Sequence, residues 1–139
     1  MKSAKTKNGY IVVCSLGEDV IASLVKFASE NKIHSGTMMG IGALKEIELG
    51  YYDIEEKVYF RRKYDGEFEL VSCSGNFALK DGEVILHCHA IFSDRDFHVI
   101  GGHLFSGKVA ITAEFYIRPE GVEIKRGPDE ATGLNLIKL

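Results

Sequence analysis

The apolar residues follow one helical pattern near the start of the chain and an extended pattern almost everywhere after it. Apolar side chains recur at helical spacing from Val20 to Ala28, behind the acidic pair Glu18-Asp19, which suits the positive end of a helix dipole. This spacing predicts a helix over about residues 18–31. Short apolar runs bounded by Gly, Asp-Gly and Ser-Gly predict strands over residues 10–16, 34–39, 43–53, 58–62, 68–74, 76–79, 84–92, 102–105, 109–118 and 122–125.

Two glycine-containing segments within this pattern predict tight turns. Asp81-Gly82 separates two apolar runs, and an Asp-Gly pair readily adopts the positive φ angles of a two-residue hairpin. Such a turn would set the register of the strand over residues 84–92. Ser106-Gly107 predicts a second hairpin. Antiparallel hairpins with one covering helix predict an α+β fold, mainly an antiparallel sheet that is meander- or barrel-like.

The length and composition predict one domain. A chain of 139 residues with 45% hydrophobic content can bury roughly two-thirds of its unfolded surface around a single core. We expect this domain over residues 9–139, with a short, polar, flexible tail over residues 1–8. No run approaches the ~18 apolar residues that a membrane span needs, and the start has no apolar leader. We therefore expect a cytoplasmic protein with no membrane partner.

Three histidines near one another form the most informative chemical pattern. Along an extended strand, His87 and His89 project from the same face with α-carbons roughly 6.6 Å apart. If a neighbouring strand supplied His103, three imidazoles would surround a cation and leave a coordination position open. Such a set suits zinc or another divalent transition metal. The alternative is that these histidines are hydrogen-bonded core residues.

The cysteines add no ligand to this pattern. Cys14, Cys73 and Cys88 lie in apolar runs without any Cys-x-x-Cys pair, which predicts buried, reduced thiols. Cys88 lies between His87 and His89, so strand alternation directs it to the opposite face.

An open metal position would also suit a metal-dependent lyase or hydrolase. Such an enzyme needs a group near the metal that can move a proton. Glu114 is the best candidate catalytic residue because it interrupts a mostly apolar run, and Glu69 is the second candidate. Both could equally be solvent-facing strand residues.

Nucleic-acid binding has weaker support. The net charge of -3 disfavours it, because neutralising phosphates needs a clustered basic surface. The only basic cluster interleaved with aromatics spans Tyr59–Tyr64, where Arg61 and Lys63 would share a strand face with Tyr59. A solvated edge strand explains the same cluster. The glycines of Met39–Ala43 lack a dinucleotide-binding pattern and predict a bulge or a close approach of two backbones.

The sequence resembles the plants and prokaryotes conserved (PPC) domain family, in its stand-alone prokaryotic form, over almost the whole chain. The resemblance rests on the segments Gly17–Asp19, Ser35-Gly36, Gly40–Ala43, Tyr51–Asp53, Gly66–Leu70, Ser74–Asn76, His87–Ala90, Gly101–Leu104 and Thr112–Glu114. It implies an α+β subunit that assembles as a homotrimer, with His87, His89 and His103 able to hold a metal, usually zinc. The fold is also similar to that of acetolactate decarboxylase, whose metal is held by comparable histidines.

The resemblance also brings an association with DNA. Plant members carry AT-hook motifs before this domain. In this chain, Lys125–Pro128 matches such a motif only in part, and Gly127-Pro128 within it predicts a turn. Minor-groove recognition therefore does not transfer to this chain.

A homotrimer also has a physical reason. Many strands with one covering helix leave apolar sheet surface for a partner subunit to bury. We expect a metal-binding homotrimer that holds a small-molecule ligand at the metal, with DNA binding and metal-dependent catalysis as the alternatives.

Overall fold

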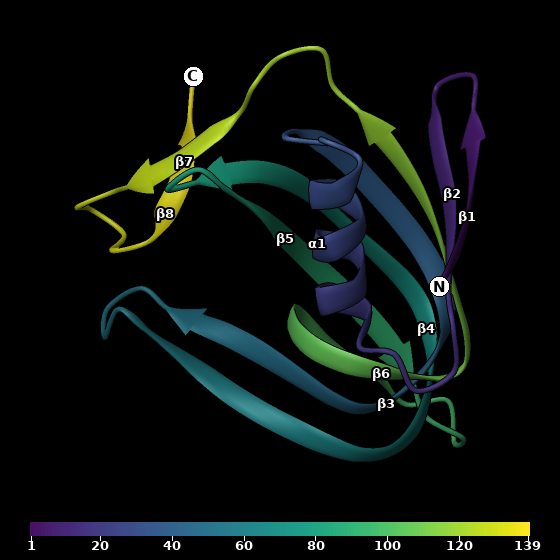
Figure 1. The fold of residues 1–139 in the computed structure, drawn as a ribbon. Coiled ribbons are helices and arrows are strands. Elements are labelled where there is room, and N and C mark those ends of the chain that lie inside the picture. Colours follow the sequence, from purple (N-terminus) through teal and green to yellow (C-terminus); the bar gives the residue numbers. More distant parts are fainter.

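In a computed structural model of the chain, which describes residues 1–139, one eight-stranded sheet curls around a single helix (Figure 1). This confirms the predicted α+β class. In chain order, the elements are β1 (Lys2–Thr6), β2 (Gly9–Cys14), α1 (Val20–Glu30), β3 (Gly36–Asp53), β4 (Val58–Lys80), β5 (Glu83–Ser93), β6 (Val99–Pro119), β7 (Lys125–Pro128) and β8 (Asn135–Lys138).

The sheet closes on itself through its four longest strands. Its main order is β1-β2-β6-β3-β4-β7-β8, and β5 pairs with both β4 and β6. Because β3 also pairs with both β4 and β6, the strands β3, β4, β5 and β6 form a ring of hydrogen-bonded neighbours. All pairings are antiparallel except the single parallel pair that joins β7 to β4. The predicted barrel-like antiparallel sheet is therefore confirmed.

The helix lies where the apolar spacing predicts it. Asp19 caps its N-terminus, because one carboxylate oxygen accepts the Ala22 N–H at 2.9 Å, and the other oxygen accepts the Gly107 N–H at 3.1 Å. The buried face of α1 joins a cluster of 22 core residues on the inner side of the sheet. The single helix, α1, has 11 residues and is too short to span a membrane.

The strands are longer and fewer than the apolar runs suggest. The predicted strands over residues 58–62, 68–74 and 76–79 are parts of β4, and those over 34–39 and 43–53 are parts of β3. The predicted hairpin at Ser106-Gly107 is wrong, because β6 runs through it. Gly107 serves packing instead: a β-carbon there would lie 3.0 Å from the Leu44 side chain.

The glycine predictions at Asp81-Gly82 and at Met39–Ala43 are confirmed. Asp81 and Gly82 have φ angles of 53° and 85°, so they form the expected two-residue turn between β4 and β5. The register between β3 and β4 shifts between Gly40 and Gly42, which is the expected bulge. A β-carbon on Gly42 would lie 2.3 Å from the Thr112 carbonyl oxygen, so a side chain cannot fit at this close approach of two backbones.

Both ends of the chain differ from the sequence predictions. The tail expected over residues 1–8 contains β1, which pairs with β2; all five β1 side chains are exposed, so no apolar pattern reveals the strand. The strand expected over residues 122–125 starts at Lys125 and includes Gly127-Pro128, where a turn was expected, and β8 was not predicted. The antiparallel pair of β7 and β8 brings Arg126 to the histidines.

Candidate metal centre

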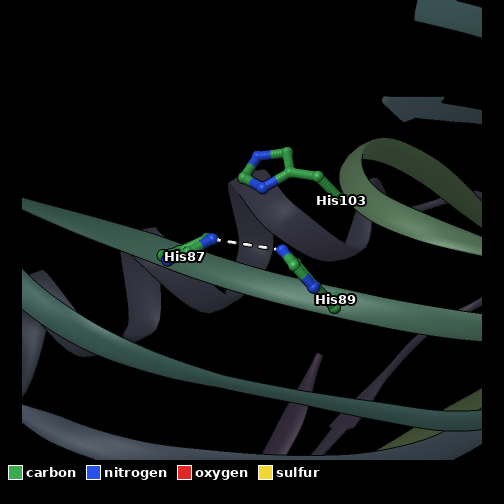
Figure 2. A group of neighbouring side chains, drawn as sticks. All are labelled: His87, His89 and His103. Carbon is green, nitrogen blue, oxygen red and sulfur yellow. Dashed lines mark hydrogen bonds between the residues drawn. The ribbon is translucent and has the colours of Figure 1, made fainter. Parts of the chain in front are cut away.

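The sheet brings the three histidines together on one face. His87 and His89 lie on β5, and His89 is the direct cross-strand partner of His103 on β6. The residue between the first two, Cys88, is buried in the core. Figure 2 shows the helix on the far side of the strand that carries His87 and His89, with the three imidazoles directed toward one another. The predicted alternation is therefore confirmed.

The spacing of the ring nitrogens suits a small cation. One nitrogen of each histidine lies within 4.8 Å of the others, and the His87 and His89 Nε2 atoms are 3.3 Å apart. Two nitrogens that each lie about 2.05 Å from a tetrahedral zinc ion are about 3.3 Å apart. The β5 pair therefore already has the separation that such coordination requires.

The environment favours the neutral form of two of these imidazoles, His87 and His103, and the neutral form is the one that binds metals. The pKa of His103 is lowered to about 4, first by burial and then by charge repulsion from His87, His89, Arg61 and Arg126. The pKa of His87 is lowered for similar reasons, burial being the largest.

One buried nitrogen in the cluster lacks a partner. His103 Nδ1 makes no hydrogen bond. A buried polar atom without a hydrogen-bond partner costs about 1–3 kcal/mol of stability. A cation bound to the three histidines would give this cluster of nitrogen ligands a partner. The residues present therefore fit a metal ion.

Aromatic rings form one wall of the site. The His103 ring lies 4.6 Å from Phe105 and 5.2 Å from Tyr59, between ring centres. The guanidinium carbon of Arg61 lies 3.7 Å from the centre of the Phe105 ring, and Arg61 Nε pairs with Glu48 at 2.8 Å. Tyr59 and Arg61 thus share a strand face as predicted, but a carboxylate engages the arginine.

Arg126 is the residue at the site that the sequence analysis missed. Its Nη2 lies 3.0 Å from His87 Nδ1 and donates to Asn76 Oδ1 at 2.9 Å, while its Nη1 donates to the Asn135 carbonyl oxygen at 3.1 Å. Its Nε is buried without a partner. The only sequence signal for this residue was its place in the hook-like segment Lys125–Pro128, which gave no hint of contact with a histidine.

The loop between β7 and β8 is fixed to the tip of the β3–β4 hairpin. The Tyr52 hydroxyl donates to the Thr132 carbonyl oxygen at 2.5 Å, and Lys57 Nζ donates to the Glu130 carbonyl oxygen at 2.8 Å. These contacts hold the segment that carries Arg126 beside the histidines.

A shallow hollow of about 440 Å³ opens beside the β5 histidines. Thr37, Ser74, Asn76, His87 and His89 contribute to its lining. The hollow therefore borders two of the three histidines.

The structure does not bring the two candidate proton-transfer residues to the histidines. Glu114 is exposed on β6, eleven residues beyond His103, where it lies opposite Val13 and Ile41. Glu69 is also exposed, on β4 opposite Ala43 and Ser93. Neither belongs to the group of ligand atoms around His87, His89 and His103.

A second group of candidate ligands lies in the turn between β5 and β6. It consists of Asp94, Asp96 and His98. One Asp94 oxygen accepts the backbone N–H groups of Asp96 and His98, each at 2.9 Å, so this group is explained as a hydrogen-bonded turn.

Comparison with known proteins agrees with this architecture. The model of the Plants and Prokaryotes Conserved (PCC) domain family matches residues 1–119. The chain belongs to this family. No curated protein matches the chain.

Three solved structures share the fold of this family member along nearly its whole length. A metal-containing protein from Archaeoglobus fulgidus is 33% identical, with 100% of both chains covered and a TM-score of 0.88. A plant- and prokaryote-conserved protein from Pyrococcus horikoshii is 32% identical, with 99% of this chain and 95% of that chain covered and a TM-score of 0.89. A protein from Bacteroides thetaiotaomicron, provisionally described as DNA-binding, is 28% identical, with 99% and 96% covered and a TM-score of 0.95.

Proposed function

We propose that this protein is a cytoplasmic homotrimer that binds zinc or another divalent transition metal through His87, His89 and His103. The metal would hold a small-molecule ligand rather than drive catalysis. The observation that carries the proposal is the convergence of three imidazoles, with the two β5 nitrogens 3.3 Å apart. The similar protein from Archaeoglobus fulgidus, described as metal-containing, supports it.

The chain's own residues would divide the work at this site. The three imidazoles would hold the metal, which supplies a Lewis-acid position for a ligand. Phe105 and Tyr59 cover His103 on one side and limit the access of water there. The hollow beside His87 and His89 would admit the ligand from the other side.

Metal content tests the proposal directly. We expect about one metal ion per chain by elemental analysis of the purified protein, as one three-histidine site would hold. His87→Ala removes a ligand and should abolish stoichiometric binding. His34→Ala is the matched control, because His34 is exposed and lies outside the cluster. Equal metal content in the wild type and His87→Ala would refute the site.

An exposed apolar surface supports the homotrimer. Ile41, Val71 and Ile111 are 60%, 52% and 69% exposed and line one shallow hollow of about 380 Å³ on the sheet. Met39 and Tyr116 are direct cross-strand partners and extend the same sheet surface. A contiguous apolar surface of this kind is typical of a subunit interface.

Light scattering after size-exclusion chromatography tests this assembly. The wild type should have the mass of three chains, and Ile41→Asp should yield monomers because it places a charge in the interface. Ile54→Asp changes a similarly exposed isoleucine at the tip of the β3–β4 hairpin and should leave the trimer intact. A monomeric wild type would refute the proposal.

DNA binding is the second candidate, favoured by the provisional description of the Bacteroides thetaiotaomicron protein. The net charge of -3 and the pairing of Arg61 with Glu48 weigh against it. A salt titration of DNA binding decides the matter: affinity at physiological ionic strength that falls in Arg62→Ala would support it, and no affinity would remove it.

A metal-dependent lyase or hydrolase remains the third candidate. Its proposed proton-transfer residue, Glu114, is a solvent-facing strand residue in the single chain. Only a neighbouring subunit could bring such a carboxylate to the histidines.

A further inference from the structure

His87 has a single ring lone pair, and two groups need it. A neutral imidazole carries one N–H and one nitrogen with a free lone pair. Arg126 Nη2 can only donate, so its 3.0 Å contact makes His87 Nδ1 the acceptor and leaves the hydrogen on Nε2. That hydrogen points to His89 Nε2, 3.3 Å away. A metal bound at His87 Nε2 needs the lone pair on that nitrogen, so the hydrogen must move to Nδ1. Nδ1 can then no longer accept a hydrogen bond, and the contact between Arg126 and His87 must break when the metal binds.

The released guanidinium would stay beside the metal. Its contacts with Asn76 Oδ1 and the Asn135 carbonyl oxygen do not involve His87 and can anchor it in place. Its Nε already lacks a partner, and the broken contact would leave Nη2 with a further free donor. Buried donors without acceptors are costly, so the arginine would then be ready to bind an acceptor.

The charges around the site favour an anion as that acceptor. The permanently charged groups that act on His103 are Arg61 and Arg126, and both are positive. Glu48 already pairs with Arg61. A divalent metal on three neutral imidazoles would add two positive charges next to Arg126, and a small anion would offset them.

We propose that the metal-loaded site binds a small oxyanion, a carboxylate or a phosphoryl group, jointly through the metal and Arg126. Arg126 would exchange one partner, the His87 lone pair, for another, the anion. A planar guanidinium suits this role because it can donate two parallel hydrogen bonds to two oxygens of such a group. This inference rests on the proposed metal site.

Linked binding of cobalt and anions tests the inference. Metal-free protein is titrated with Co²⁺ against a competing chelator in chloride buffer, then with acetate or with methylphosphonate added. In the wild type, at least one anion should tighten Co²⁺ binding by about 5- to 150-fold, the usual range of coupling between two sites. The visible absorption of bound Co²⁺ should change at the same time, because the anion enters its coordination shell.

Variants of the two arginines identify the group responsible. Arg126→Met removes the competitor for His87, so Co²⁺ should bind more tightly than in the wild type without anion, and the anion effect should vanish. Arg61→Gln is the control, because Arg61 lies over Phe105 and pairs with Glu48; it should keep the effect. Circular dichroism shows whether each variant folds. If Arg126→Met does not fold, the wild-type titration with the two anions still tests the inference.

The outcomes separate this inference from the metal site. Wild-type protein that binds Co²⁺ normally but responds to neither anion would overturn the inference alone. A full anion effect in Arg126→Met would do the same. Failure of the wild type to bind Co²⁺ stoichiometrically would refute the metal site itself. A response to acetate only, or to methylphosphonate only, would support the inference and identify the anion class.

Discussion

His103 should make the metal-free protein sensitive to acid, and His103→Phe should remove that sensitivity. The pKa of His103 is lowered to about 4 in the folded chain, first by burial, from an ordinary value of 6.5. The unfolded state therefore takes up a proton at a higher pH than the folded state does. This histidine's contribution to the free energy of unfolding is complete above pH 6.5, falls as the pH drops toward 4 and is fully lost below it.

The size of the effect follows from the shift. A displacement of about 2.5 pKa units corresponds to about 3.4 kcal/mol at most, and solvent screening of this half-buried ring reduces the expected loss to about 1–2 kcal/mol. Phenylalanine keeps the ring contacts with Tyr59 and Phe105 and has no Nδ1 to leave unpaired. We therefore expect His103→Phe to raise the unfolding free energy at pH 7.5 by about 1 kcal/mol.

Urea unfolding of metal-free protein at pH 7.5 and pH 5 measures both quantities. The wild type should lose stability between these pH values, and His103→Phe should lose about 0.6–1.2 kcal/mol less than the wild type, because roughly 60% of the screened loss occurs by pH 5. Ile91→Phe is the control because Ile91 is an exposed residue of β5 with no titratable group, and it should keep the wild-type pH dependence. An unchanged pH dependence in His103→Phe would refute the reasoning. So would a wild type that is equally stable at both pH values.

Three further substitutions test the fold and the site. Asp19→Ala removes the helix cap and the acceptor of the Gly107 N–H, and should lower the urea unfolding free energy by about 1–2 kcal/mol; an unchanged value would contradict the capping role. Gly107→Val forces a side chain against the core where β6 runs straight, and should cost about 1–3 kcal/mol in the same assay. Gly121→Val, at a position with open space, serves as its control. Glu114→Gln should change stability by less than about 0.5 kcal/mol and leave metal content unchanged; lost metal would show that Glu114 reaches the site in the assembled protein.

Local patterns in the sequence predict the parts of the fold that depend on neighbouring residues. The helix follows from apolar spacing and an acidic cap, and the turn at Asp81-Gly82 follows from the φ preferences of that pair. The shared face of His87 and His89 follows from strand alternation alone. Each of these features needs only a few consecutive residues.

Local sequence patterns do not predict which distant segments pair with one another. The sequence indicates no partner strand for β6, so it does not predict that His103 lies directly opposite His89. Gly107 resembles a turn residue, but close packing explains it. Arg126 reaches His87 only because β7 joins β4 through one parallel pair, which leaves no signal in either segment.

The two faces of β5 make the histidine cluster a reporter on the protein interior. Cys88 lies between the two β5 histidines and is buried in the core, where the Cys73 thiol and burial raise the pKa of its own thiol. A change in core volume at Cys88 would tilt the strand and alter the 3.3 Å separation of the His87 and His89 nitrogens without touching either ring. The visible absorption spectrum of a Co²⁺ ion bound to the histidines would then report changes in side-chain packing around Cys88.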